Sequence, residues 1–179
     1  VEVSINQIVN SGEVTANYIK NRNPEAVVYI VGTPSLVEEF EDVNLEVVTE
    51  KNKEIDYLIL GFDTTLNYKK LWDAHDLILE NTEYIATNPD KVCPLPAGKS
   101  MPDCGSMIQL LKTSTGKEPE VVGKPNTKMI DYVSSLTGIT KEKMGMIGDR
   151  LYTDIQTAIN AQITSILVLS GETNKSELR

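Results

Sequence analysis

The strongest constraint on the fold is a short apolar run that ends in a glycine and two aspartates. Met144 to Ile147 favours a strand, Gly148 ends it, Asp149 follows at once, and Asp154 comes where a helical pattern begins. This order places two carboxylates at the carboxyl end of a strand, the edge at which open parallel α/β sheets bind ligands. Oxygen ligands beside a glycine turn suit a hard cation such as Mg²⁺, so one interpretation is a magnesium site.

The same residues permit a purely structural interpretation. Asp149 could accept hydrogen bonds from loop amides, and Asp154 could cap the following helix, because aspartate is common at both kinds of position. Taken alone, the stretch from Met144 to Asp154 supports the two interpretations equally.

The charge balance and the apolar pattern bear on partners and location. The chain has 179 residues, with 17 Lys and Arg against 26 Asp and Glu, a net charge of −9. A nucleic-acid surface needs clustered basic residues, so we expect no nucleic-acid partner. No apolar stretch reaches the roughly 20 residues of a membrane span, so we expect no membrane association. Cys93 and Cys104 lack CxxC spacing, which favours a reducing compartment and a cytoplasmic protein over a secreted one with a single disulfide.

Strand-like runs alternate with helical patterns along most of the chain, which predicts an α/β fold. The expected strands are 26–31, 45–48, 57–60, 84–87, 121–122, 144–147 and 163–169, and the expected helices are 13–20, one beginning at 33 or 34, 68–81, 107–112, 126–137 and 154–161. Ser11 is expected to cap the first helix. Residues 91–105 are rich in proline and glycine, and we expect a linker there rather than regular structure.

The predicted helix over 68–81 carries one stripe of large side chains, which we expect to be its apolar face. The stripe consists of Tyr68, Leu71, Trp72, His75, Ile78 and Leu79. The single histidine of the chain lies on this stripe, and we expect it to be packed or at the surface edge rather than catalytic.

A second constellation, Gly123-Lys124-Pro125, precedes the predicted helix at 126–137. Proline suits the first helical position, where free amides and the helix dipole attract an anion, and Lys124 adds a full charge. Alone, this tripeptide indicates no more than a surface lysine before a helix. Joined to the aspartates about 25 residues later, it predicts a cation and a metal on adjacent strand ends, which suits phosphoryl chemistry.

Three segments, in a consistent order, resemble the haloacid dehalogenase (HAD) superfamily in its NagD-like, p-nitrophenylphosphatase-type branch. They are Val122-Gly123-Lys124-Pro125-Asn126, Met146-Ile147-Gly148-Asp149-Arg150-Leu151-Tyr152-Thr153-Asp154-Ile155 and Ile166-Leu167-Val168-Leu169-Ser170-Gly171. Shorter segments at 61–63, 68–71, 85–90 and 102–106 are similar to cap-domain signatures of the same branch.

The resemblance implies a Rossmann-like HAD core, formed by residues 1–20 and 103–179, with an inserted α/β cap at 21–102. It implies a Mg²⁺-dependent phosphatase of small phosphomonoesters, such as sugar phosphates or similar metabolites, and a homodimer would fit it. Lys124 would stabilise the nucleophile and the phosphate, Asp149 would bind Mg²⁺ directly, and Asp154 would support the same metal site. Three cap residues would contribute to substrate binding: Asp63, Asn88 and Asp90.

The chain departs from the family in one respect. The family's nucleophile is an aspartate of an Asp-x-Asp-Gly motif after the first core strand, and this sequence contains no such motif. Its nearest counterpart, the segment 58–66, has Gly61 in place of the nucleophile and lies in the cap. Because the sequence starts at Val1 and stops at Arg179 within a polar stretch, we expect the first core strand and the nucleophile to lie upstream.

Two other functions fit parts of the pattern. A non-catalytic relative could retain Lys124 and Asp149 to hold a phosphorylated ligand or a metal. A phospho-receiver domain would need an acidic cluster at its start and an uninterrupted sheet, and the insertion at 26–102 argues against it.

Overall fold

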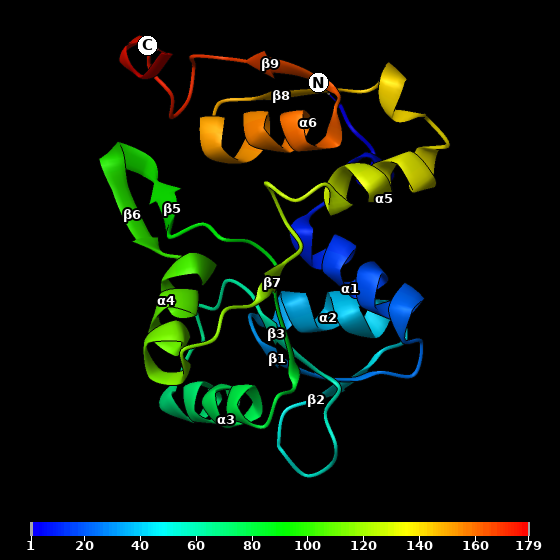
Figure 1. Ribbon diagram of the computed structural model, residues 1–179, viewed down its shortest axis with the longest axis vertical. Coiled ribbons are helices and arrows are strands. Elements are labelled where there is room, and N and C mark those ends of the chain that lie inside the picture. The colour runs from blue at the N-terminus through cyan, green and yellow to red at the C-terminus, as the bar shows by residue number, and fades with distance from the viewer. Residues whose placement is uncertain (1, 179) are drawn as a thin grey trace. The chain divides into compact units, whose positions relative to one another are not determined.

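The computed structural model describes residues 2–178, which form two compact units (Figure 1). The first unit ends at Val122 and the second begins at Gly123. Val1 and Arg179, on which the expectation of a missing upstream segment rests, lie outside the described residues.

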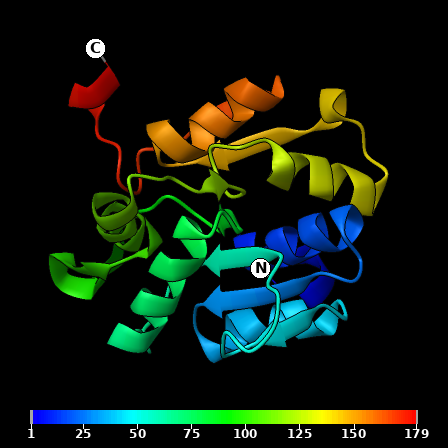
Figure 2. The same cartoon turned by 60° about the horizontal axis from the view of Figure 1, so that its bottom comes forward.

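The first unit is built on a five-stranded sheet in the order β2-β1-β3-β4-β7, and each neighbouring pair is parallel. The strands are β1 (Val27–Val31), β2 (Glu46–Val48), β3 (Tyr57–Leu60), β4 (Glu83–Ala86) and β7 (Glu120–Val121). β1 and β3, side by side in Figure 2, are almost continuously apolar, as expected of parallel strands covered on both faces. The predicted α/β class is confirmed.

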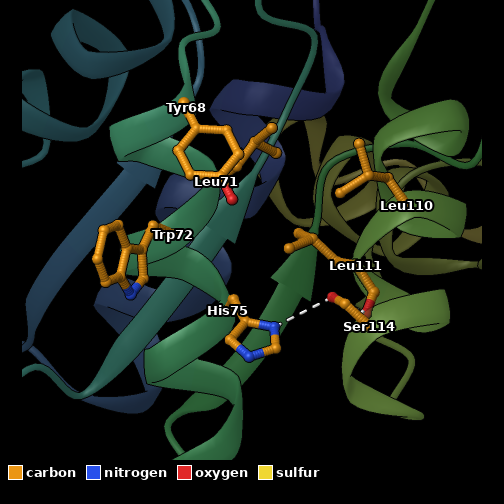
Figure 3. A pocket seen from close by; sticks show the side chains of 7 residues that line it. All are labelled: Tyr68, Leu71, Trp72, His75, Leu110, Leu111 and Ser114. Carbon is orange, nitrogen blue, oxygen red and sulfur yellow. Dashed lines mark hydrogen bonds between the residues drawn. The ribbon is translucent and has the colours of Figure 1, made fainter.

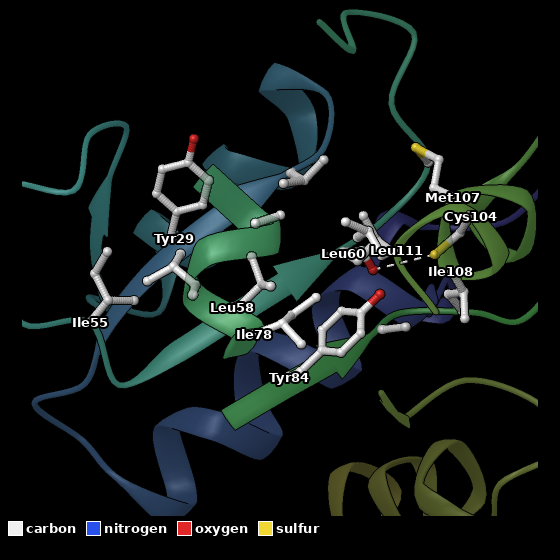
Figure 4. Close-up of a cluster of buried hydrophobic side chains, with 14 residues drawn as sticks. Tyr29, Ile55, Leu58, Leu60, Ile78, Tyr84, Cys104, Met107, Ile108 and Leu111 are labelled. Carbon is white, nitrogen blue, oxygen red and sulfur yellow. Dashed lines mark hydrogen bonds between the residues drawn. The ribbon is translucent and has the colours of Figure 1, made fainter. Parts of the chain in front are cut away.

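Helices cover both faces of this sheet. They are α1 (Ser11–Arg22), α2 (Pro34–Asp42), α3 (Tyr68–Leu79) and α4 (Cys104–Thr115). Tyr29, Leu58 and Tyr84 turn toward α3 and α4 and form one buried cluster with them (Figure 4). Because strand side chains alternate, Val28 and Ile59 point to the opposite face, where α1 and α2 pack on each other.

The capping residue of α1 differs from the prediction. Asn10, not Ser11, is the N-cap, and its side-chain oxygen accepts hydrogen bonds from the amides of Gly12 at 2.7 Å and Glu13 at 3.0 Å. Ser11 is already helical. Both residue types are good caps; the cap lies one residue earlier than predicted, and the helix begins two residues earlier.

The predicted apolar stripe of α3 is buried only in part: Ile78 belongs to it and is buried, but the other members are exposed or half-buried. The helix packs through Ala74, Leu77 and Ile78, whereas Tyr68 is 79% and Trp72 62% exposed. Tyr68 and Trp72 therefore belong to a neighbouring, exposed face of the helix.

The proline-rich segment is regular, so the prediction of a linker at 91–105 is wrong. β5 (Val92–Leu95) and β6 (Lys99–Pro102) pair antiparallel around a turn at Pro96–Gly98 (Figure 1). Both strands belong to a two-stranded sheet. Each strand is therefore an edge strand, with one side that forms no ladder hydrogen bonds. Edge strands tolerate proline, so the missing N–H groups of Pro94 and Pro102 are accommodated there.

The second unit contains a parallel pair, β8 (Gly145–Gly148) and β9 (Thr164–Leu167), joined through a single π turn at Leu151–Ile155 and α6 (Gln156–Ala161). α5 (Lys128–Thr137) precedes them. The predicted strand, helix and strand are therefore confirmed. The added feature is the π turn, a distortion often found at functional sites.

The division into units differs from the predicted domain boundaries at 20/21 and 102/103. α1 packs against α2, and α4 packs against α3, so both helices belong to the first unit with the sheet. Sequence motifs do not reveal such helix packing. The assignment of core and cap remains a prediction.

The longest helices among residues 2–178 have 12 residues, or about 18 Å at 1.5 Å per residue. A bilayer core is about 30 Å thick. No helix of this part of the chain could cross a membrane.

Candidate functional site

Asp149 lies directly after β8, beside the loop that follows β9 in the second unit. Its Oδ2 atom accepts a hydrogen bond from the Glu172 amide at 2.7 Å, and its carbonyl oxygen accepts one from the Thr173 amide at 3.1 Å. Among the described residues, only Oδ2 of this carboxylate accepts a hydrogen bond, which leaves Oδ1 for a cation. The carboxylate is thus oriented at the carboxyl end of a parallel strand pair, as the sequence predicted.

Lys124 and Asp154 form an ion pair in the same unit. Lys124 Nζ donates to Asp154 Oδ1 at 2.6 Å, and Asp154 Oδ2 accepts a hydrogen bond from the Arg150 amide at 3.2 Å. The Asp154 side chain is 8% exposed and that of Lys124 is 39% exposed. The lysine therefore keeps part of its surface exposed while the buried carboxylate holds it.

Pro125 does not occupy the first turn of a helix, contrary to the prediction. α5 begins at Lys128, and residues 123–126 form a turn closed by a hydrogen bond from the Asn126 amide to the Gly123 carbonyl at 3.0 Å. An anion bound here would therefore depend on the charge of Lys124 rather than on the dipole of α5, whose N-terminus is three residues away from Pro125 in sequence.

The two aspartates differ in what they offer a metal ion. Both oxygens of Asp154 are already bonded, one to Lys124 and one to a backbone amide, so Asp154 fits the role of a supporting carboxylate. Asp149 has the chemistry of a hard-cation ligand. Residues 2–178 contain no group of three His, Cys, Asp or Glu side chains that could hold a metal. A metal at Asp149 would therefore need water, substrate oxygens or ligands from outside these residues.

Two glycines allow the backbone to pass close to these carboxylates: Gly148 beside Asp154 and Gly171 beside Asp149. A Cβ atom on Gly148 would lie 2.2 Å from the Cβ atom of Asp154, and one on Gly171 would lie 1.9 Å from Asp149 Oδ2. Both distances are too short for any side chain, so the loops can fold over the carboxylates only where glycine stands.

The three predicted cap residues lie at neighbouring strand ends of the first unit. Asp63 follows β3, and its fully buried side chain pairs with Lys70 at 2.7 Å and accepts hydrogen bonds from Thr65. Asn88 follows β4 and accepts a hydrogen bond from the Asp90 amide at 3.0 Å. Asn88 also lines a small cavity of about 170 Å³. Asp63 is thus tied into the fold, and the substrate roles of all three residues remain predictions.

Two other candidate groups lack the features of a catalytic site. Cys104 is fully buried with its sulfur 3.4 Å from the Leu60 carbonyl oxygen, and burial raises the pKa of its thiol to about 12. A groove of about 360 Å³ between α3 and α4 contains His75, whose Nδ1 atom lies 3.1 Å from Ser114 Oγ (Figure 3). The groove is otherwise lined mainly by aromatic and leucine side chains, and the histidine lies at the surface edge, as predicted.

Sequence reasoning did not single out Arg150, Tyr152 or Glu172. The Glu172 carboxylate forms an ion pair with Arg150 Nε and accepts a hydrogen bond from the Tyr152 hydroxyl at 3.1 Å. The only sequence sign was charge placement: an arginine beside Asp149 and a glutamate beside Gly171.

Comparison with known proteins supports the phosphatase interpretation. Residues 121–179 match a family described as HAD-hydrolase-like. The whole chain is 30% identical to the acid sugar phosphatase of Staphylococcus epidermidis and covers 68% of it. The solved structure of 4-nitrophenylphosphatase from Thermotoga maritima is 42% identical, with a TM-score of 0.92 over 99% of this chain and 67% of that one.

A further solved structure is the glycerol phosphate phosphatase of Mycobacterium tuberculosis in complex with calcium. It is 29% identical, with a TM-score of 0.89 over 96% of this chain and 51% of that one. The chain thus spans between half and about two thirds of these three relatives. It belongs to the haloacid dehalogenase superfamily, in the NagD-like branch of p-nitrophenylphosphatase-type phosphoric monoester hydrolases.

Proposed function

We propose that the protein is a Mg²⁺-dependent phosphatase of small phosphomonoesters, sugar phosphates or similar metabolites. The observation that carries the proposal is the second unit itself, in which the Lys124–Asp154 pair and the Asp149 carboxylate occur in a chain whose relatives are phosphatases. The nucleophile would be an aspartate outside these 179 residues, since the sequence has no Asp-x-Asp-Gly motif. It would form an aspartyl-phosphate that water then hydrolyses.

Each residue has a defined part in this proposal. Lys124 would bind the substrate phosphate and neutralise charge that develops on its oxygens, because such electrostatic stabilisation is usually the largest single term in catalysis. Asp154 would keep the lysine in place through the 2.6 Å contact. Asp149 would hold Mg²⁺, which supplies further positive charge to the phosphate when it is bound.

The substrate class is supported by the names of the relatives. The Staphylococcus epidermidis relative is an acid sugar phosphatase, and the Mycobacterium tuberculosis relative is a glycerol phosphate phosphatase. Both names describe small phosphomonoesters. Asp63, Asn88 and Asp90 remain candidates for selecting among such molecules, and a cytoplasmic location and a homodimer remain predictions.

Hydrolysis of p-nitrophenyl phosphate by the full-length protein tests the proposal. We expect turnover with Mg²⁺ that disappears on chelation with EDTA and returns when Mg²⁺ is added back. A panel of sugar phosphates and glycerol phosphates should then compete with the chromogenic substrate. Absence of turnover with every one of these substrates, in a folded protein supplied with Mg²⁺, would refute the proposal.

A non-catalytic binding protein that keeps Lys124 and Asp149 for a phosphorylated ligand or a metal is the second candidate, and the accessible Lys124 beside the buried Asp154 fits it equally well. Such a protein would bind inorganic phosphate without hydrolysing any ester. Isothermal titration with phosphate, run beside the hydrolysis assay on the same preparation, separates the two functions.

A further inference from the structure

A three-residue tie connects the turn after β8 with the loop after β9. Its centre is the Glu172 carboxylate, which pairs with Arg150 Nε through one oxygen and accepts a hydrogen bond from the Tyr152 hydroxyl through the other, at 3.1 Å. Arg150 and Tyr152 lie on either side of the start of the π turn at Leu151–Ile155. Glu172 lies in the loop that follows β9.

The same glutamate contacts Asp149 through its backbone. The Glu172 amide donates to Asp149 Oδ2 at 2.7 Å, and the next amide, that of Thr173, donates to the Asp149 carbonyl oxygen at 3.1 Å. The Thr173 residue is 4% exposed, so this end of the loop is anchored. A change in the position of the loop therefore changes the orientation of the Asp149 carboxylate.

Arg150 is fixed from its other side as well. Its amide donates to Asp154 Oδ2 at 3.2 Å and its carbonyl oxygen accepts from the Ile155 amide at 3.1 Å. Its side chain is 18% exposed, against 48% for Glu172. The arginine is thus the more buried partner, held by its backbone as well, and the ion pair joins the more exposed Glu172 side chain to it.

We propose that Glu172 is a positioning residue for the Asp149 carboxylate, acting through its ion pair with Arg150 and its hydrogen bond with Tyr152. This inference rests on the proposed function, because it assigns the tie to the orientation of a metal ligand. Residues that orient metal ligands commonly change metal affinity about 10- to 100-fold when they are replaced.

Glu172 and Arg150 could affect metal binding through their charges alone, and this explanation predicts different variant affinities from a positioning role. If only charge mattered, removing Glu172 would weaken binding of a cation, whereas removing Arg150 would strengthen it. If the tie positions Asp149, both removals weaken binding, because either one removes the side-chain restraint on Glu172, whose amide bonds to Asp149 Oδ2. The effect of replacing Arg150 therefore has opposite signs under the two explanations.

Direct binding of Mn²⁺ to the full-length protein, followed by the electron paramagnetic resonance signal of the free ion, measures this effect without catalysis. We expect Glu172→Ala and Arg150→Ala each to raise the dissociation constant about 10-fold. The double variant should have a dissociation constant no higher than that of the weaker-binding single variant, since both substitutions break the same ion pair. Tyr152→Phe keeps the ion pair and should raise the dissociation constant only a few-fold.

Glu142→Ala is the matched control, because it removes one negative charge from an exposed site of the same unit and leaves the tie intact. It should bind Mn²⁺ like the wild type. Thermal unfolding without metal checks folding, and Glu172→Gln serves if Glu172→Ala is unfolded. Tighter binding by Arg150→Ala, or wild-type binding by Glu172→Ala, would overturn the inference. A wild-type protein that binds no Mn²⁺ and hydrolyses no ester would instead refute the proposed function.

Discussion

Lys124 owes its proposed role to the contact with Asp154, because a lysine on a turn would otherwise sample many orientations. The pair is asymmetric, with a nearly buried carboxylate and a lysine that still reaches solvent. Such a lysine is held in place while part of it remains accessible to a phosphate. Substitution of Lys124 can therefore test whether the lysine acts in catalysis or only in folding.

Lys124→Ala should reduce the turnover of p-nitrophenyl phosphate about 100-fold or more, because a preorganised charge at a reacting oxygen commonly contributes this much. The protein should stay folded, since Asp154 keeps its hydrogen bond with the Arg150 amide. Steady-state kinetics and circular dichroism of the full-length variant check both statements. An unfolded Lys124→Ala variant would show that the ion pair is mainly structural.

The two cysteines should differ in reactivity. Burial raises the pKa of Cys104 to about 12, so at pH 8 its thiol is almost entirely protonated and shielded, whereas Cys93 is partly exposed on the hairpin. Labelling of the native protein with a thiol reagent, followed by mass spectrometry, should modify Cys93 alone. Both cysteines should react in urea. Rapid native labelling of Cys104 would contradict its place in the buried cluster.

At the scale of elements, the loops around Asp149 depend on glycine. The sequence placed Asp149 correctly because an apolar run followed by glycine and aspartate is a local pattern. It could not reveal that the loop after β9 folds back onto this carboxylate, because that contact joins residues 149 and 172 through space. For the same reason, the sequence does not reveal the contacts of Glu172 with Arg150 and Tyr152.

Gly171→Ala should weaken metal binding and activity about 10-fold or more, because the added methyl group would lie 1.9 Å from Asp149 Oδ2. Gly145→Ala is the control: its Cβ atom would approach no atom closer than 3.5 Å. Kinetics at several Mg²⁺ concentrations should show a raised requirement for the first variant only. Equal behaviour of the two variants would mean that the loop is loosely held.

The packing of α1 on α2 should make stability depend on pH. Burial raises the pKa of Glu39, and the hydrogen bond from Asn10 offsets this only in part. The folded protein thus binds this proton more tightly than the unfolded chain, so the free energy of unfolding falls as pH rises from about 4.5 through the raised pKa. The free energy of unfolding therefore stays lower at neutral pH than at pH 4 as far as Glu39 is concerned.

Glu39→Gln keeps an oxygen for the Asn10 hydrogen bond and has no charge to bury. Urea denaturation should show a higher free energy of unfolding than the wild type at pH 7, and a difference that vanishes near pH 4. Glu38→Gln, on the exposed side of the same helix, should leave the profile unchanged. A constant difference at all pH values would indicate a packing effect instead.

At the scale of the whole molecule, local sequence patterns predicted most strands and the α/β class. The features that they did not predict depend on packing between residues distant in sequence. Near-continuous apolar runs such as β3 identify buried parallel strands without knowledge of their neighbours. The buried face of α3 and the β5–β6 hairpin depend instead on partners distant in sequence or on tolerance of proline at sheet edges. The division into compact units after Val122 also reflects such packing, and the assignment of core and cap remains a prediction.

The central claim is that Asp149 makes this chain part of a metal-dependent phosphatase. Its most direct test is Mg²⁺-dependent hydrolysis of p-nitrophenyl phosphate by the full-length Asp149→Asn variant, which preserves the shape of the side chain and an oxygen for the Glu172 amide. We predict that Mg²⁺-stimulated turnover falls about 100-fold or more while the melting temperature without metal is unchanged. Turnover and Mg²⁺ dependence equal to those of the wild type would contradict the account.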